Sequence, residues 1–455
     1  MASLPGFFST LFNLALPITL QNLLQTFINM LDTVMVGRLG SVEIAAVGLG
    51  NQIFFMLNMV LFGISSGGSI FFAQFWGKGD VASIRKTLGI TLLLSLVVAT
   101  VFFVGAAFFP ATLIGLYSHD EQVIALGARY LQIAGLCYPF MAIGFAYQFS
   151  FRGTGHVRLP MVSTAAGLIT NATANLLCIF GAQFTFGTVT IAIPALGVVG
   201  AAIATVLARI VECVITVSYS YTHHFESASH PRLLFSFDRK FFLRYIRIAV
   251  PVIINETIWG LGITVQNSIF SHAGTDAIAS FNITGTISQL TWVFFIGMGN
   301  GASIILGKKV GAHQEAEARQ YAYRFAWFMP LAAAFISLLL IPLSLLLPHL
   351  FNVAPHIIRQ AQYMMYVLAC SYPLNAFNMF FIVGLSRSGG DTVYGAVNDT
   401  LWMWCVALPL AACAAFLWHA EPYIIYLCLL SEQILKLTAG LLRLHSGKWL
   451  RNVTE

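Results

Sequence analysis

The chain has 455 residues, of which 58% are hydrophobic and only 9% charged, and its formal net charge is +6. So few charged side chains cannot cover the water-facing surface of a globular protein of this length, and the composition therefore excludes a soluble protein. Repeated apolar runs of about 20 residues or more predict an all-α polytopic membrane protein. A membrane β-barrel is excluded, because its strands would alternate apolar and polar residues over about ten positions.

The apolar runs predict twelve membrane spans, near residues 11–36, 45–75, 86–110, 123–150, 158–181, 192–221, 242–270, 279–307, 318–346, 356–385, 393–417 and 420–442. The longest hydrophilic connection, residues 222–241, divides these spans six and six. We therefore predict an N-terminal lobe over 1–221, a cytoplasmic linker over 222–241, and a C-terminal lobe with a cytoplasmic tail over 242–455.

The first span contains a carboxylate, Asp32. At helical spacing this residue shares one face with Pro17, Gln21, Gln25 and Asn29. An acidic side chain at membrane depth costs roughly 2.5–3.5 kcal/mol on insertion scales, which favours a functional role over an incidental one. The alternative is that Asp32 lies near the helix end and bonds only to neighbouring backbone.

The two halves of the sequence resemble each other at a constant offset of 234 residues. The matching pairs include Pro17 with Pro251, Gly40 with Gly274, Gly63 with Gly297, Gly67 with Gly301, and Gly77 with Gly311. This agreement predicts an internal duplication into two six-helix bundles. Because each half has an even number of spans, the pseudo-two-fold axis should run along the membrane normal, as in parallel-repeat transporters. The paired G-x-x-x-G motifs predict close helix packing rather than ligand contact.

The positively charged residues give the orientation. Most of the 23 Lys and Arg residues fall in the connections after the even-numbered spans or in the tail, where we also place Arg152, Arg387 and Lys436. The opposite connections hold only Arg38, Arg129 and Arg359. Because cytoplasmic connections are enriched in Lys and Arg, we expect both termini in the cytoplasm. The net charge reflects this asymmetry, so no nucleic-acid partner is expected.

Spans five and six add polar groups to the N-terminal lobe. Asn171 and Asn175 lie one turn apart in span five and would complete an ion or proton site with Asp32 if helices one and five are neighbours. The alternative is that the two amides only tie helices together. In span six Arg209 and Glu212, at positions i and i+3, are expected to neutralise each other as a structural pair.

The second half carries its own carboxylate, Glu256, in span seven. Glu256 shares a helical face with Thr264 and Asn267, and we favour a functional role for it over that of a structural hydrogen-bond anchor. Span ten holds Asn375 and Asn378, and the turn after it contains Asp391, which we expect to be solvated.

Enzyme motifs are missing from the sequence. It contains no H-E-x-x-H, no G-x-S-x-G and no Walker-type phosphate loop, and its histidines make no credible metal cluster. We therefore expect a protein that is not an enzyme and needs no cofactor, and uphill transport would have to draw on an ion gradient.

The chain resembles the multidrug and toxic compound extrusion (MATE) family over essentially its whole length. The resemblance is carried by the two six-span halves, by LDTVMVGRLG closing the first span, and by PVIINETIWGLG, RGTGHVRLP and RSGGD. It implies an efflux transporter of the prokaryotic cytoplasmic (inner) membrane in which Asp32 takes part in H⁺ or Na⁺ coupling. Asn175 stands where many members have an aspartate. A Na⁺ would therefore have one carboxylate fewer as a ligand, and burial favours the neutral form of an acid, so we favour H⁺ over Na⁺.

The expected substrates are lipophilic or cationic small molecules, because aromatic faces attract cations and apolar walls desolvate them. Candidate site residues are Asp32, Asn171, Asn175 and Asn29 for ion coupling, and Glu256, Gln25, Asn267, Trp259, Phe27 and Met30 for substrate or a second acidic site. We expect a monomer in contact with membrane lipid. The alternative function is a lipid-linked oligosaccharide flippase, which needs basic side chains in its cleft, whereas this sequence places only Arg209 at depth.

Overall fold

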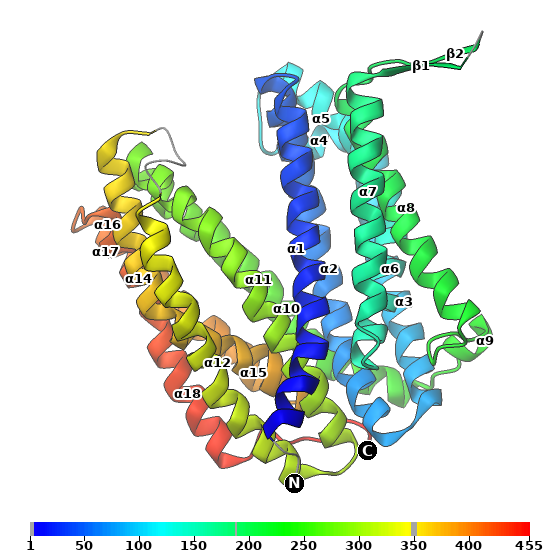
Figure 1. Cartoon of the computed structure of the whole chain (residues 1–455), viewed down its shortest axis with the longest axis vertical. Helices are drawn as coiled ribbons and strands as arrows, with labels where there is room; N and C mark the ends of the chain where they lie inside the picture. The colour runs from blue at the N-terminus through cyan, green and yellow to red at the C-terminus, as the bar shows by residue number, and fades with distance from the viewer. Residues whose placement is uncertain (1–3, 187–188, 347–352) are drawn as a thin grey trace. The chain divides into compact units, whose positions relative to one another are not determined.

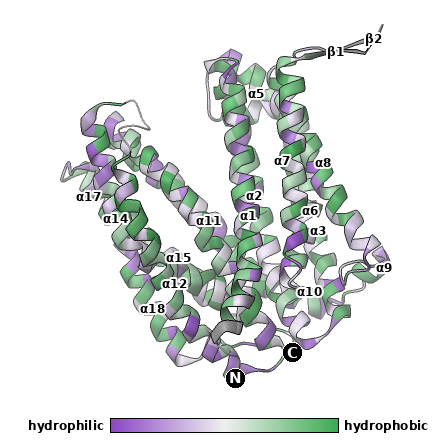
Figure 2. Ribbon diagram, viewed as in Figure 1, coloured by the Kyte–Doolittle hydropathy of each residue, from purple (hydrophilic) through white to green (hydrophobic). Residues whose placement is uncertain are grey.

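The computed structural model describes residues 4–186, 189–346 and 353–455, and in them twelve helical spans are long and apolar enough to cross a membrane. The predicted fold class and the predicted number of spans are thus confirmed. Figure 2 shows hydrophobic residues along most of the length of the helices, with hydrophilic residues frequent at helix ends and in connections. This distribution is the one expected of helices that satisfy their own backbone hydrogen bonds inside a bilayer.

The elements of the first half are α1 (Leu4–Gly37), α2 (Ser41–Lys78), α3 (Val81–Phe108), α4 (Pro110–Gly115), α5 (Glu121–Ala134), η1 (Gly135–Cys137), α6 (Tyr138–Gly153), α7 (Arg158–Phe180), β1 (Ala182–Phe186), β2 (Val189–Ile193), α8 (Val198–Thr222) and α9 (Pro231–Leu234). Those of the second half are α10 (Arg239–Ala273), α11 (Thr275–Gly311), α12 (Glu315–Ser344), α14 (Pro355–Met379), η2 (Phe380–Ser386), α15 (Thr392–Trp402), η3 (Met403–Ala407), α16 (Leu408–Phe416), α17 (Pro422–Leu430) and α18 (Glu432–Ser446).

A short hairpin follows α7 and was not predicted. Strands β1 and β2 pair antiparallel, with Ala182 opposite Ile193, and Figure 1 shows the hairpin leaving the end of the α7–α8 pair. The stretch is rich in β-branched and aromatic residues, which favour strands over helices. The sixth span consequently begins at Val198, six residues later than the predicted start at 192.

The chain divides into two compact units. The N-terminal unit comprises Leu20–Phe72 and Val81–Ile246, and the C-terminal unit comprises Met1–Thr19, Ala73–Asp80 and Arg247–Glu455. Each unit has its own apolar core, with Leu57, Leu131 and Tyr138 in the first and Phe295, Phe325 and Tyr372 in the second. The division into lobes at the linker 222–241 stays a prediction.

The first helix of each half begins in the unit of the other half. Near the start of α1, the ring of Phe7 lies 4.8 Å from that of Phe325 in the C-terminal unit. Near the start of α10, the hydroxyl of Tyr245 donates to the Ile64 carbonyl at 2.9 Å, within the N-terminal unit. Phe7 and Tyr245 are both fully buried, so these turns are integral to the cores that they join.

The predicted repeat is visible in a reciprocal contact between α2 and α11 in the C-terminal unit. A Cβ at Gly77 would lie 2.0 Å from the Lys308 carbonyl oxygen, and a Cβ at Gly311 would lie 1.9 Å from the Gln74 carbonyl oxygen. Gln74 and Lys308 are themselves 234 positions apart. Gly77 thus touches the equivalent of Gln74, and Gln74 touches the equivalent of Gly77. Such a reciprocal contact is the signature of a local two-fold. Only glycine allows these backbones to approach so closely.

Two further glycine predictions agree with the structure. Gly297 and Gly301 face α1, because added Cβ atoms would meet Thr19 and Ala15, as expected for a G-x-x-x-G packing face. The turns after α1 and α10 use the equivalent glycines Gly40 and Gly274, whose φ angles are 155° and 130°. Residues with a side chain rarely adopt such angles.

The predicted solvation of Asp391 is wrong. Its side chain is 1% exposed and accepts from Arg443 Nε at 2.7 Å and from Arg451 Nη2 at 3.0 Å. The C-terminal tail covers this turn, since the Arg451 amide donates to the Gly389 carbonyl at 2.8 Å. The tail supplies both the cover and one of the two cations that balance the carboxylate.

Three cations that we assigned to connections or to the tail are buried instead. Arg152 is the last but one residue of α6, Arg387 follows directly after η2, and Lys436 lies within α18. Their exposed fractions are 7%, 5% and 3%. Each has a carboxylate or amide partner from a distant part of the sequence, which is how a charge at such a position becomes tolerable.

Candidate functional site in the N-terminal unit

Asp32 is held by span five. The Asn175 side chain, on α7, donates from Nδ2 to Asp32 Oδ1 and also to Asn171 Oδ1, the latter at 3.0 Å. The two asparagines are 0% and 1% exposed, whereas Asp32 is half-buried. Their spacing of one helical turn makes this possible, because residues i and i+4 lie on one face of α7. The expected amide neighbours of Asp32 on span five are thus in contact with it.

Two polar atoms of this group lack a hydrogen-bond partner among the described residues. They are Oδ1 of Asn175, an acceptor, and Nδ2 of Asn171, a donor. A buried polar atom without a partner costs about 1–3 kcal/mol, so both atoms favour a state with an additional partner. A carboxyl proton or a small cation would supply a partner for the free acceptor, and a carboxylate that rearranges would supply one for the free donor.

A cavity of about 250 Å³ adjoins Asp32. Its walls include Asn29, Asn51, Phe54, Tyr130, Thr205 and Arg209. Tyr130 donates to Asn51 Oδ1 at 3.0 Å, which fixes two of the polar groups that face the cavity. Asn29, the third expected neighbour of Asp32, lines the same cavity, and no hydrogen bond joins the two side chains in the described structure.

Arg209 and Glu212 form the expected ion pair, with Nη1 of the arginine 2.8 Å from Oε2 of the glutamate. Besides neutralising each other, the two side chains bind residues of other helices. Arg209 also donates to Gln25 Oε1 at 3.1 Å, and its guanidinium lies 5.7 Å from the centre of the Phe54 ring. Glu212 Oε1 accepts from Gln148 at 3.0 Å and from Thr164 at 2.7 Å. The pair therefore joins α1, α6 and α7 to α8.

A second cavity, of about 140 Å³, shares Arg209 and Glu212 with the first. Its other walls include Gln21, Phe62, Phe145, Phe149 and Arg152. Arg152 donates to Gln21 Oε1 from Nη2 at 2.6 Å and from Nε at 3.2 Å. The inference that only Arg209 lies at depth is therefore wrong, because Arg152 lines this cavity as well.

The other candidate residues do not join this group. Phe27 and Met30 are 50% and 62% exposed and line neither cavity. Glu256, Trp259 and Asn267 belong to the C-terminal unit. There Glu256 accepts from Arg387 Nη2 and is 9% exposed, while Asn267 donates to the Ile263 carbonyl of its own helix at 3.0 Å. Trp259 packs against the apolar core of the same unit.

Sequence reasoning missed several polar residues of the cavities, namely Gln148, Arg152, Thr164, Tyr130 and Thr205. Gln148 and Arg152 lie four positions apart in the fourth span and so share one helical face, which was the available signal, while Thr164 lies in the fifth span and Thr205 in the sixth. That signal does not say which helices meet. Among the described residues no group of three or more His, Cys, Asp or Glu side chains is placed to hold a metal ion.

Comparison with known proteins decides the family. A family model described as MatE matches residues 17–177 and 251–398, two segments that begin at the equivalent prolines of the repeat. The chain belongs to the MatE family. This MATE chain is 25% identical over 398 residues to the probable multidrug resistance protein YoeA of Bacillus subtilis (strain 168), covering 87% of this chain and 84% of that protein.

Other proteins similar to this MATE transporter carry names of the same family. It is 24% identical over 453 residues to the probable multidrug resistance protein NorM of Thermotoga maritima, with 96% of this chain and 92% of that one covered. Among solved structures, a MATE protein in complex with MaL6 has a TM-score of 0.83 at 20% identity, over 96% of both chains. An aspartate-to-asparagine variant of the Vibrio cholerae MATE transporter VcmN has a TM-score of 0.85 at 17% identity, over 99% and 98% of the two chains. These likenesses place the fold in the MATE multidrug efflux family.

Proposed function

We propose that this MATE chain is a secondary active efflux antiporter that exports amphipathic, often cationic, organic compounds in exchange for H⁺. The observation that carries the proposal is the contact of Asp32 with a buried amide pair, one member of which keeps a free acceptor, at the edge of a cavity. Support also comes from relatives that are named as probable multidrug resistance proteins.

The proposed coupling step is a change of hydrogen-bond partners at Asp32. The ionised carboxylate only accepts, and Asn175 Nδ2 serves it. The protonated carboxyl gains one O–H donor, for which Asn175 Oδ1 is the available acceptor. The two protonation states thus favour different positions of α1 against α7. An ion shifts a conformational equilibrium only through such a difference in affinity.

H⁺ is preferred over Na⁺ as the coupling ion because the group has a single carboxylate. A Na⁺ here would find one carboxylate and neutral amide oxygens, whereas a proton needs only one acceptor and an environment of low polarity. The larger cavity has Asp32 and Glu212 against Arg209, a net charge of −1 with all three ionised, which suits the positive end of a cationic substrate.

A flippase for a lipid-linked oligosaccharide is the second candidate, and the buried Arg152 favours it. The smaller cavity holds Arg152 and Arg209 against Glu212, a net charge of +1, and arginines bind phosphate well. Antiport remains the better proposal, because Gln21 and Glu212 already occupy donors of both guanidinium groups. A flippase would be expected to leave more of these donors free for the diphosphate.

The remaining expectations are part of this proposal. The transporter would lie in a prokaryotic cytoplasmic membrane as a monomer, with both termini in the cytoplasm. Glu256 would be the second acidic site, in the C-terminal unit. Neither role needs a cofactor other than the coupling ion.

The test is transport of a fluorescent lipophilic cation into proteoliposomes under an imposed pH gradient alone and under an imposed Na⁺ gradient alone. We expect wild type to respond to the pH gradient and Asp32→Asn to lose gradient-driven accumulation while still binding the cation. Asp120→Asn is the matched control, because Asp120 caps α5 from an exposed position and asparagine caps a helix about as well. Accumulation that follows Na⁺ and ignores pH would refute the ion, and undiminished accumulation by Asp32→Asn would refute the site.

A further inference from the structure

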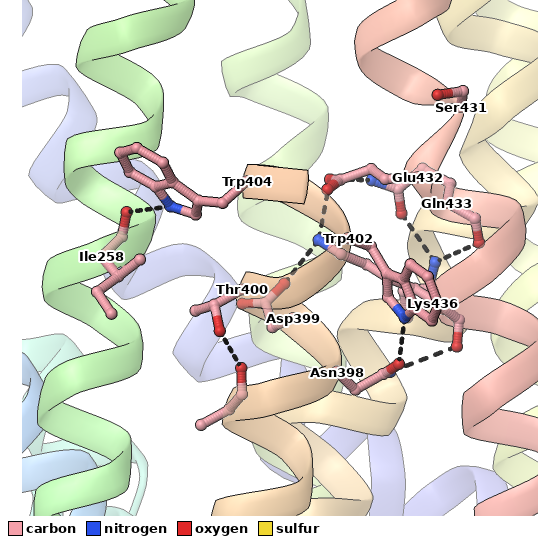
Figure 3. Close-up of polar contacts among 12 residues, drawn as sticks. Ile258, Asn398, Asp399, Thr400, Trp402, Trp404, Ser431, Glu432, Gln433 and Lys436 are labelled. Carbon is pink, nitrogen blue, oxygen red and sulfur yellow. Dashed lines mark hydrogen bonds and ion pairs between the residues drawn. The ribbon is translucent and has the colours of Figure 1, made fainter. Parts of the chain in front are cut away.

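A buried cluster of three charged side chains in the C-terminal unit contains none of the residues assigned to the ion or substrate sites. Lys436 Nζ is 2.8 Å from Asp399 Oδ1 and 2.9 Å from Glu432 Oε1 (Figure 3). All three residues are at least nine-tenths buried, with exposed fractions of 3%, 7% and 7%. Asp399 comes from α15, and Glu432 and Lys436 come from α18, both of which are parts of membrane-spanning segments.

The cluster does not balance its own charge. One ammonium faces two carboxylates, which leaves a net charge of −1 when all three groups are ionised. Neutral neighbours complete the surroundings: Gln433 donates to Glu432 Oε1 at 3.1 Å, and Asn378 of α14 donates to Gln433 Oε1 at 2.8 Å. Among the described residues, no further charged side chain from α14, α17 or η3 contacts Glu432. An isolated buried charge is costly, so one additional positive charge is expected to bind here.

The free atom identifies where that charge would bind. Glu432 Oε1 accepts from both Lys436 and Gln433, whereas Glu432 Oε2 has no hydrogen-bond partner among the described residues. Asn378 Oδ1, on the residue that holds Gln433, is a second buried acceptor without a partner. A proton on Glu432 Oε2 would neutralise the cluster and turn this unpartnered acceptor into a donor.

The local backbone also departs from a regular helix at this place. A turn at Ser431 separates α17 from α18, directly before Glu432. The segment after Trp402 is π-helical over Met403–Ala407, and the one after Met379 is π-helical over Phe380–Ser386. Such insertions in helices are frequent at functional sites and let a helix change its course. The three helices that supply Asp399, Glu432 and Asn378 are each interrupted close to the cluster.

We propose that Glu432 is a second proton-binding site of this transporter, with Lys436 and Asp399 as the groups that position it. The proton would bind Oε2 from water and return to water when the cluster is again ionised. A metal cation is disfavoured, because it needs several oxygen ligands, whereas a proton needs one, and in the described part of this cluster the acceptors without a partner are Glu432 Oε2 and Asn378 Oδ1. The proposal of transport coupling at Glu432 rests on the proposed antiport function, whereas proton binding at Glu432 does not.

The first measurement needs no substrate. Infrared difference spectra of the purified protein in lipid, recorded across a pH titration, report protonated carboxyl groups directly. We expect Glu432→Gln to remove one titrating carboxyl band that Asp32→Asn leaves in place. Asp399→Asn should remove the same band, because it leaves Glu432 and Lys436 as a neutral pair, and it serves as the second variant if Glu432→Gln does not fold. Glu315→Gln is the control, since Glu315 is exposed at the start of α12.

The second measurement is the accumulation ratio of a lipophilic cation in proteoliposomes. Each proton exchanged per transport cycle supports an accumulation ratio of about tenfold when the pH gradient is one unit. If Glu432→Gln exchanges one proton fewer, its accumulation ratio should fall about tenfold, while exchange of the cation without a gradient continues. A titration band unchanged in Glu432→Gln and in Asp399→Asn, or one that responds to Na⁺ in place of pH, would overturn the proposal. An altered band with unaltered accumulation would keep the proton site and overturn its coupling to transport.

Discussion

A double-mutant cycle on the buried pair of Glu256 and Arg387 can separate the two hypotheses for Glu256, a functional acidic site and a structural anchor. Counting side-chain atoms alone, Glu256 is 12% and Arg387 6% exposed, and Arg387 Nη2 donates to Glu256 Oε1. Removing one partner of a buried ion pair costs about 3–5 kcal/mol, because the remaining charge loses its compensation. Glu256→Gln should therefore destabilise the C-terminal unit by that amount, although glutamine has almost the same shape.

Removing the charge of the second partner as well should restore stability. Replacing both members by hydrophobic residues of similar volume is often neutral or stabilising by about 1–4 kcal/mol. Glu256→Gln with Arg387→Met removes both charges but leaves one buried amide, so the double variant should recover a large part of the loss. Stability would be measured by unfolding in a mixed-micelle denaturant titration, and transport by cation accumulation in proteoliposomes at equal protein. The two assays on the four proteins of the cycle give separate coupling energies for folding and for transport.

The comparison of the two coupling energies decides the role. If Glu256 belongs to a second acidic site, the double variant should regain stability and remain defective in transport. A double variant that regains both stability and transport would show that Glu256 serves only as the structural partner of Arg387. A single variant Glu256→Gln with wild-type stability would refute the reasoning altogether, because it would mean that Arg387 does not depend on this carboxylate.

Two more predictions follow from the structure. Gly77→Ala and Gly311→Ala should each destabilise the protein by about 1–3 kcal/mol, because each Cβ would meet a backbone oxygen of the facing helix. Gly285, which lies in α11 as Gly311 does, is the control, because a Cβ there would have nothing within 4 Å. Gly285→Ala should therefore be neutral or slightly stabilising in thermal unfolding. Equal effects at all three sites would contradict the close crossing of α2 and α11. Arg152→Gln should weaken binding of substrates that carry a carboxylate or phosphate and spare purely cationic ones, because it removes a cation from the smaller cavity; equal losses for both classes, measured by equilibrium binding, would indicate a structural role.

The number of spans and the repeat could be predicted because both are read from the order of the residues alone. The contact of Asp32 with span five was predicted only on the condition that helices one and five are neighbours, which the structure shows. Apolar runs report membrane spans wherever they occur, and the offset that pairs Gly77 with Gly311 needs no knowledge of the fold. Asn171 and Asn175 could be named because they share one face of one helix. The hairpin after α7 was missed because its residues continue an apolar run, and periodicity does not separate a short apolar strand from the start of a helix.

The buried cations could not be predicted, because counting Lys and Arg by their position in the sequence assumes that each of them faces water. Whether a cation is buried depends on its partner, and the partners come from far away: Arg387 binds Glu256, 131 positions earlier, and Lys436 binds Asp399, 37 positions earlier. The same reasoning treated Lys436 as a tail residue, and the two acids around it then had no reason to be singled out. Arg209, Arg387 and Lys436 each bind a buried carboxylate, whereas Arg152 binds the amide oxygen of Gln21. The informative search therefore starts from the cations: Arg209 leads to Glu212 and the cavity beside Asp32, and Lys436 leads to Glu432, the carboxylate with an unpaired oxygen.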